Sequence, residues 1–152
     1  MGILNRLFGP KQEAPPEIIN DAVHTMENFA RSIMKHYGEQ HFEGDTQAKQ
    51  VLSLYCFGGL GALAIQHKMS QPQAHGVALA LLTSFFGYPP QDAAAKAQAC
   101  ITAAPDRTSH LYPTIHRGLD GFLHWQKHQD AVAAQDFVAI MDQFKKFEKN
   151  EG

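Results

Sequence analysis

Hydrophobic positions recur at three- and four-residue steps over most of this chain, which is the pattern of amphipathic helices. Residues 16–38 carry one such apolar face, formed by Ile19, Val23, Met26, Ala30, Ile33 and Tyr37. Gly38 is a typical C-terminal stop for this segment. The spacing therefore predicts a first long helix that turns one side toward a core.

The segment 46–67 is different because it is apolar almost all round, with VLSLYCFGGLGALAI at its centre. This pattern predicts a buried central helix. Ser70 with Pro72 marks another helix start, and Gly87 before two prolines marks its end. An alanine-rich helix is expected over about 90–103, and a last helix over about 131–149, with Phe137, Ile140, Met141, Phe144 and Phe147 on its apolar face.

The segment 113–128 separates into two faces when it is wound as a helix. Its apolar side holds Ile115, Leu119, Phe122, Leu123 and Trp125, with Gly118 among them. Its polar side holds His116, Arg117, Asp120, His124, Lys127 and His128, with Gly121 at the edge. Such varied polar chemistry opposite a strongly apolar face makes this segment the first place to look for a functional surface.

No stretch alternates convincingly as a strand, so the chain is predicted to be all-α. We expect a compact single-domain bundle of five or six principal helices with an apolar central helix, spanning residues 1–152. Residues 39–45 read as a polar loop. Residues 1–16 are expected to form a short amphipathic segment, with Ile3, Leu4, Leu7 and Phe8 together, followed by a connector.

Composition narrows the class of partner. The 152 residues are 44% hydrophobic and 18% charged, with a formal net charge of −2, which gives no general attraction for nucleic acid. The longest apolar stretches, 51–65 and 76–88, fall short of the roughly 20 residues of a membrane span, so no stable membrane insertion is expected. Cys56 and Cys100 lie in apolar helical patterns, and we expect them to be buried reduced thiols in a cytoplasmic protein.

Glycines interrupt two of the predicted helices. Gly58, Gly59 and Gly61 lie in the most apolar one, and Gly118 and Gly121 lie three apart in the 113–128 segment. Each costs about 0.5–1 kcal/mol relative to alanine inside a helix. The favoured explanation is a close helix crossing, which these two helices would make together; the alternative is a backbone-lined cleft for a ligand or a partner side chain.

Metal binding and catalysis find little support in the sequence. His116, Asp120, His124 and His128 follow one another at four-residue steps, a spacing that can chelate an ion. The glutamate of the HExxH motif is absent, however, and Lys127 would repel a cation. No nucleophile elbow surrounds Ser84. We therefore expect neither a metal, nor another cofactor, nor an enzyme activity.

The segments HRGLDGFLHW, LYCFGGLGALAIQHKMS and AQACITAA together resemble a small all-helical family of immunity proteins from bacterial polymorphic toxin systems. The resemblance covers about residues 45–130. It implies a non-catalytic protein that binds a cognate toxin from the same operon and blocks or inactivates it. It names neither the toxin's chemistry nor the contact residues.

Residues for that contact are therefore chosen from the polar side of 113–128, namely His116, Arg117, Asp120 and His124. Arginine is favoured at binding hot spots, and aspartate commonly steers association. A helical ligand- or metal-binding module remains an alternative. So does a non-catalytic adaptor that uses the apolar residues at 3–8 to engage a membrane surface or another protein, although these residues can equally dock on their own domain. The sequence does not define the oligomeric state.

Overall fold

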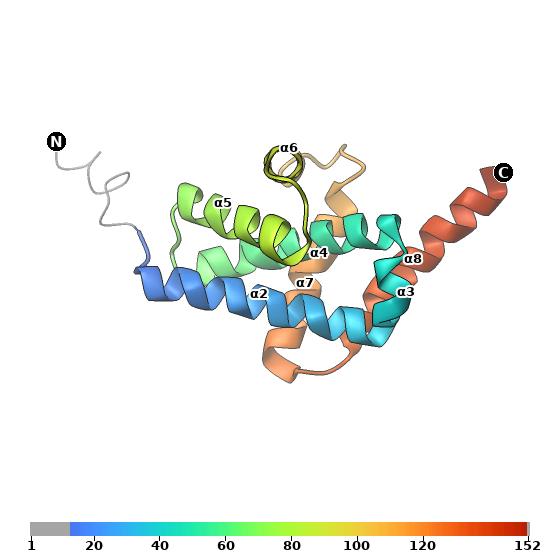
Figure 1. The fold of residues 1–152 in the computed structure, drawn as a ribbon, viewed down its shortest axis with the longest axis horizontal. Coiled ribbons are helices and arrows are strands. Elements are labelled where there is room, and N and C mark those ends of the chain that lie inside the picture. The colour runs from blue at the N-terminus through green and yellow to red at the C-terminus, as the bar shows by residue number, and fades with distance from the viewer. Residues whose placement is uncertain (1–12, 152) are drawn as a thin grey trace.

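The structure is a computed structural model that describes residues 13–151, with side chains described as far as Phe147. The described part is helical throughout and contains no strand (Figure 1). Its elements are α2 (Pro16–Tyr37), α3 (Glu39–Glu43), α4 (Thr46–Gln66), α5 (Gln71–Ala80), the π-helical turn η2 (Leu81–Phe85), α6 (Pro90–Ala103), α7 (Tyr112–His128) and α8 (Val132–Glu151). The all-α prediction is confirmed.

Local sequence signals set the helix starts. Pro16 and Pro90 begin α2 and α6, where a missing backbone N–H costs nothing. The Asp45 carboxylate accepts a hydrogen bond from the Ala48 backbone N–H at 3.0 Å and so caps α4. Ser70 and Gln73 form a capping box at the start of α5.

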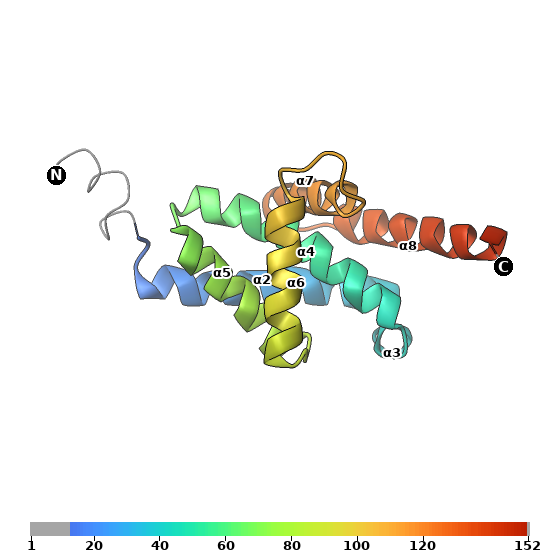
Figure 2. The same ribbon diagram turned by 90° about the horizontal axis from the view of Figure 1, so that it is seen from above.

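The core is built around α4, as its all-round apolar pattern predicts. Leu52, Tyr55 and Cys56 of this helix are fully buried. They are covered by α2, α5 and α7, and α8 packs at one end (Figures 1 and 2). Phe29 of α2 stacks on Tyr55 and meets Phe122 edge-on, with ring centroids 6.0 and 5.2 Å apart. The apolar core therefore joins α2, α4 and α7 directly.

One helix of the described residues, α4, is long and apolar enough by length and composition to cross a membrane. Its uninterrupted apolar run is short, but the whole helix reaches 21 residues. The core helix of a soluble protein passes the same test, and 61% of the apolar window of α4 is buried inside the protein. Its hydrophobicity is accounted for by packing against the other helices.

The closest helix contact joins α4 and α7, and glycines make it possible. A Cβ atom on Gly58 would lie 1.8 Å from the Ile115 carbonyl oxygen. A Cβ atom on Gly118 would lie 1.9 Å from the Tyr55 carbonyl oxygen. The two backbones touch where both side chains are absent, which confirms the predicted crossing of these two helices. Gly61 differs, because no atom lies within 4 Å of the position that a Cβ atom would take there.

Three expectations about the elements were wrong. Residues 39–45 are not simply a loop, because α3 forms there and buries Phe42. The helix after Ser70 does not continue as an α-helix to Gly87; it changes at Leu81 into η2, whose hydrogen bond from Phe86 N–H to the Leu81 carbonyl has π spacing. Leu123, which the helical pattern places on the apolar side of α7, is 41% exposed. The part of α7 that is buried in the core is therefore narrower than its apolar side.

The apolar face of α8 is buried only along its first half. Phe137, Ile140 and Met141 lie in the core, whereas Phe144 and Phe147 are 38% and 63% exposed. The reason is visible in both views, since the C-terminal half of α8 extends beyond the other helices (Figures 1 and 2). The predicted amphipathic segment at residues 3–8 lies outside the described residues.

Both cysteines are free and buried, as expected. Burial raises the pKa of the Cys100 thiol to about 11, although the positive charge of Lys96 offsets part of this rise. Burial also raises the pKa of Cys56. Both thiols are therefore protonated at neutral pH and pack as small apolar groups.

Candidate partner-binding face on helix α7

The four residues singled out from the sequence lie on one side of α7, opposite the face that packs on α4. Asp120 is exposed, while His116, Arg117 and His124 are half-buried. Helix geometry places residues at steps of three and four on the same side, so the set forms one continuous strip. The structure brings the four together but gives each a different environment.

His116 lies at the N-terminal end of this strip and makes contacts within the protein. Its Nε2 lies 2.9 Å from the carbonyl oxygen of Ala104, at the end of α6, so this nitrogen carries the proton and donates it. The ring stacks on Tyr112 with centroids 3.9 Å apart. His116 therefore fixes the end of α6 against α7.

Arg117 belongs to a hydrogen-bonded chain that connects three helices. Its guanidinium forms an ion pair with Asp136 of α8. The second oxygen of Asp136 accepts a hydrogen bond from the Tyr55 hydroxyl of α4 at 3.0 Å. Gly121 gives this hydroxyl its space, because a Cβ atom there would lie 2.1 Å from it. Arg117 is thus held in place by the core rather than by its own helix.

Removing the carboxylate at the centre of this chain should destabilise the protein. Asp136→Ala leaves the buried Tyr55 hydroxyl with only a long 3.4 Å contact to the Ala133 carbonyl, and we expect a loss of about 1–2 kcal/mol in the free energy of unfolding. Tyr55→Phe removes the group that needs the carboxylate. Urea denaturation measures the free energy of unfolding of both single variants and of the double variant. The double variant should lose less stability than the two single variants lose together. Additive losses would contradict the coupling.

His124 is paired at the opposite end of the strip. Its Nε2 lies 3.0 Å from the Asp130 carboxylate in the connection to α8. The hydrogen bond from His124 lowers the pKa of Asp130, and the backbone N–H of Val132 adds to the effect. The His128 ring lies 4.5 Å from the His124 ring, centroid to centroid. This arrangement holds the α7–α8 connection close to the face.

Asp120 lies between these two anchored ends. Its carboxylate makes no hydrogen bond or ion pair within residues 13–151. Across the same range, no group of three or more His, Cys, Asp or Glu side chains is placed to hold a metal ion. The chemistry that the strip offers is therefore that of a rigid polar surface with one free carboxylate, an oriented guanidinium and two imidazole rings.

Sequence reasoning missed two residues of this face, Asp130 and Asp136. Within α7 itself, Asp120 is spaced to pair with Arg117 or with His124. Instead, both basic residues bind carboxylates that follow α7 in the chain. Asp136 lies 19 positions after Arg117, so no helical spacing signals the pair. Only the packing of α8 against α7 reveals it.

Comparison with known protein families gives a match over most of the chain. The model of the family described as Immunity protein 48 matches residues 18–145, which is most of the chain. The chain belongs to the Immunity protein 48 family. This result confirms the resemblance seen in the sequence and extends it to α2 and most of α8.

Membership in Immunity protein 48 places the chain among the immunity proteins, a class that is generally non-catalytic and whose members bind a toxin partner. The match includes the whole α4–α7 crossing and the whole strip on α7. No curated protein and no solved structure matches the chain significantly.

Proposed function

We propose that this protein neutralises a cognate bacterial toxin by forming a stoichiometric complex with it in the cytoplasm, without catalysis and without inserting in a membrane. The observation that carries this proposal is the match to Immunity protein 48 over residues 18–145. The toxin is expected to be encoded beside this protein, since an immunity protein is useful only where its toxin is made.

The contact surface that we propose is the α7 strip of His116, Arg117, Asp120 and His124. Its support is geometric: α7 is fixed by the α4 crossing, and the Asp136 carboxylate holds the Arg117 guanidinium in one orientation. A side chain that is already ordered loses less entropy when a partner binds. The strip therefore meets the main requirement of a specific interface, which is preorganisation.

Apolar area beside the polar strip adds to this proposal. Leu123 follows Asp120 by one turn of α7 and is 41% exposed, and Val132 after the α7–α8 connection is 45% exposed. Interfaces combine such apolar contacts with oriented charges, and a stable complex buries about 1,200–2,000 Å² in total. We expect the free Asp120 carboxylate to meet a basic or hydrogen-bond-donating group of the toxin.

Co-expression tests the function directly. Each candidate toxin encoded beside this protein is induced alone and together with the full chain, and cell growth is followed. We expect growth to be restored and the purified pair to elute as a complex of fixed stoichiometry in light-scattering chromatography. A catalytic antidote would protect at amounts far below those of the toxin. Toxicity that persists beside abundant folded protein, or neighbours that are all harmless, would contradict the proposal.

A further inference from the structure

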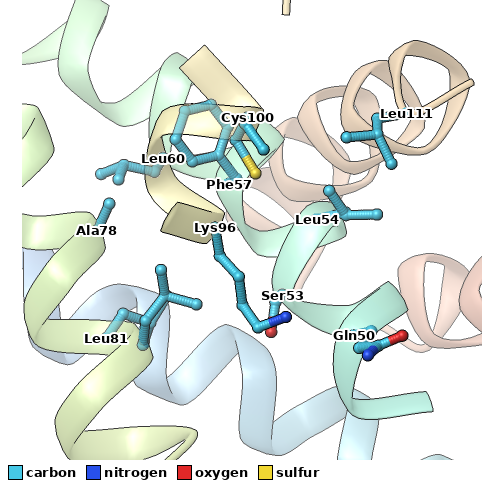
Figure 3. Close-up of a pocket in the computed structure, with 12 residues that line it drawn as sticks. Gln50, Ser53, Leu54, Phe57, Leu60, Ala78, Leu81, Lys96, Cys100 and Leu111 are labelled. Atoms are coloured by element: carbon cyan, nitrogen blue, oxygen red, sulfur yellow. The ribbon is translucent and has the colours of Figure 1, made fainter. Parts of the chain in front are cut away.

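A second feature lies away from the α7 strip: a cavity of about 270 Å³ between α4, α5, η2 and α6 (Figure 3). Its wall is mostly apolar and is formed by Gln50, Ser53, Leu54, Phe57, Leu60, Ala78, Leu81, Leu82, Lys96, Ala99, Cys100 and Leu111. Ala99 is exposed although it lines the cavity, so the space opens to solvent beside α6.

One cation reaches into this apolar space. Figure 3 shows the Lys96 side chain extending from α6 across the cavity toward Ser53 of α4. Asp92 lies four residues earlier on the same helix, a spacing that favours an ion pair. No ion pair to Lys96 is formed within the described residues, however. The ammonium group is directed to the cavity rather than to the available carboxylate.

The surroundings of Lys96 add an aromatic ring and a second positive charge. The ammonium groups of Lys96 and Lys49 lie 4.7 and 4.4 Å from the centre of the Tyr88 ring. The Tyr88 hydroxyl is buried beside Ser53. The Ser53 hydroxyl also lies 2.8 Å from the Lys49 carbonyl oxygen. Two cations on one ring repel each other, so an anion placed near Lys96 would relieve this repulsion.

The π-helical turn η2 shapes the apolar end. Thr83 donates its hydroxyl hydrogen to the Leu79 carbonyl at 2.8 Å, and the hydrogen bonds of this turn span five residues or more. The consecutive residues Leu81 and Leu82 both line the cavity. Such π-helical insertions are uncommon and are frequently found at functional sites.

We propose that this cavity is a binding site for a medium-chain carboxylate, with the alkyl chain among the leucines and the carboxylate against Lys96. The apolar wall, the Lys96 ammonium group, which forms no ion pair among the described residues, and the polar residue Ser53 at one end match an amphiphile of this charge. A cavity of about 150 Å³ holds benzene, so a volume of 270 Å³ fits a chain of roughly ten carbons.

Decanoate is the probe for this site, with decanol as the matched uncharged ligand. Titration of the full chain, followed by methyl NMR, should show saturable 1:1 binding of decanoate with a Kd of about 0.1 mM. The shifted methyl groups should be those of Leu54, Leu60 and Leu81. Absence of saturation up to about 1 mM, or shifts spread over the α7 strip, would overturn the proposal.

Variants separate the contribution of the Lys96 charge to ligand affinity from the contribution of the cavity space. Lys96→Gln should weaken decanoate binding about tenfold and change decanol binding less than about twofold. Ala99→Leu should fill the mouth and weaken both ligands about tenfold, whereas Ala95→Leu, on the same exposed side of α6 but outside the lining, should change neither. Circular dichroism verifies that each variant is folded. Equal affinity for decanoate and decanol, or no effect of Ala99→Leu, would refute the assigned ligand class or place.

Discussion

Gly58→Ala should lower the free energy of unfolding by about 3 kcal/mol, although it adds only one methyl group. The added Cβ atom would lie 1.8 Å from the Ile115 carbonyl oxygen and 2.8 Å from the Leu119 backbone nitrogen. Both obstacles are backbone atoms of α7, which cannot rotate away as a side chain can. The helices must separate, and every contact along their crossing weakens.

Gly61→Ala is the matched control, three residues further along α4. No atom lies within 4 Å of the added methyl group, so only the helix preference of alanine acts. This variant should gain about 0.5–1 kcal/mol. Thermal unfolding followed by circular dichroism should show Gly58→Ala melting about 10 °C below the natural protein.

Gly118→Ala tests the crossing from the opposite helix. Its Cβ atom would lie 1.9 Å from the Tyr55 carbonyl oxygen, so a loss like that of Gly58→Ala is expected. Equal stability of Gly58→Ala and Gly61→Ala would show that α4 and α7 do not meet as closely as described. A selective loss at positions 58 and 118 would confirm a backbone-to-backbone contact.

These glycines also show why much of the fold could be predicted from the sequence. An all-round apolar helix has to be buried, and glycines inside it are costly unless another backbone comes close. Both signals are local, and both are present at Gly58 and Gly118. Helix starts could also be predicted from the sequence, because the Ser70 capping box and the prolines act within one helical turn.

The remaining features depend on distant packing, which local spacing does not encode. Periodicity placed Phe147 on the same apolar face as Phe137, but only the structure shows that α8 extends beyond the body. The change from α5 to η2 has no breaker residue at Leu81. The partner of Arg117 was missed for the same reason, since Asp136 becomes its neighbour only when α8 folds back on α7.

The same contact decides how the proposed toxin surface should be tested. Reversing the charge of Arg117 would place two carboxylates together, because Asp136 faces that position. A loss of toxin binding could then result either from lower stability of the fold or from a lost contact with the toxin. Asp120 has no such partner within the described residues, so Asp120→Lys changes the surface and leaves the internal network intact.

Asp120→Lys should weaken toxin binding about 100-fold, because like charges facing each other in an interface cost several kcal/mol. Asp21→Lys, which makes the same charge change at an exposed position of α2, should alter affinity less than about threefold. Both variants should keep the melting temperature of the natural protein, which separates recognition from folding. Affinity is measured by calorimetry with the toxin identified through co-expression, and rescue of growth is scored in parallel.

The pair of variants also distinguishes a wrong surface from a wrong function. If the natural protein restores growth and Asp120→Lys binds as tightly as Asp21→Lys, the toxin contacts another face, and neutralisation itself stands. If Asp120→Lys alone loses binding, Arg117→Met provides the next step, because it removes the guanidinium without placing a negative charge against Asp136. A further loss in Arg117→Met, beyond any change in its stability, would show that the guanidinium held by Asp136 reaches the toxin.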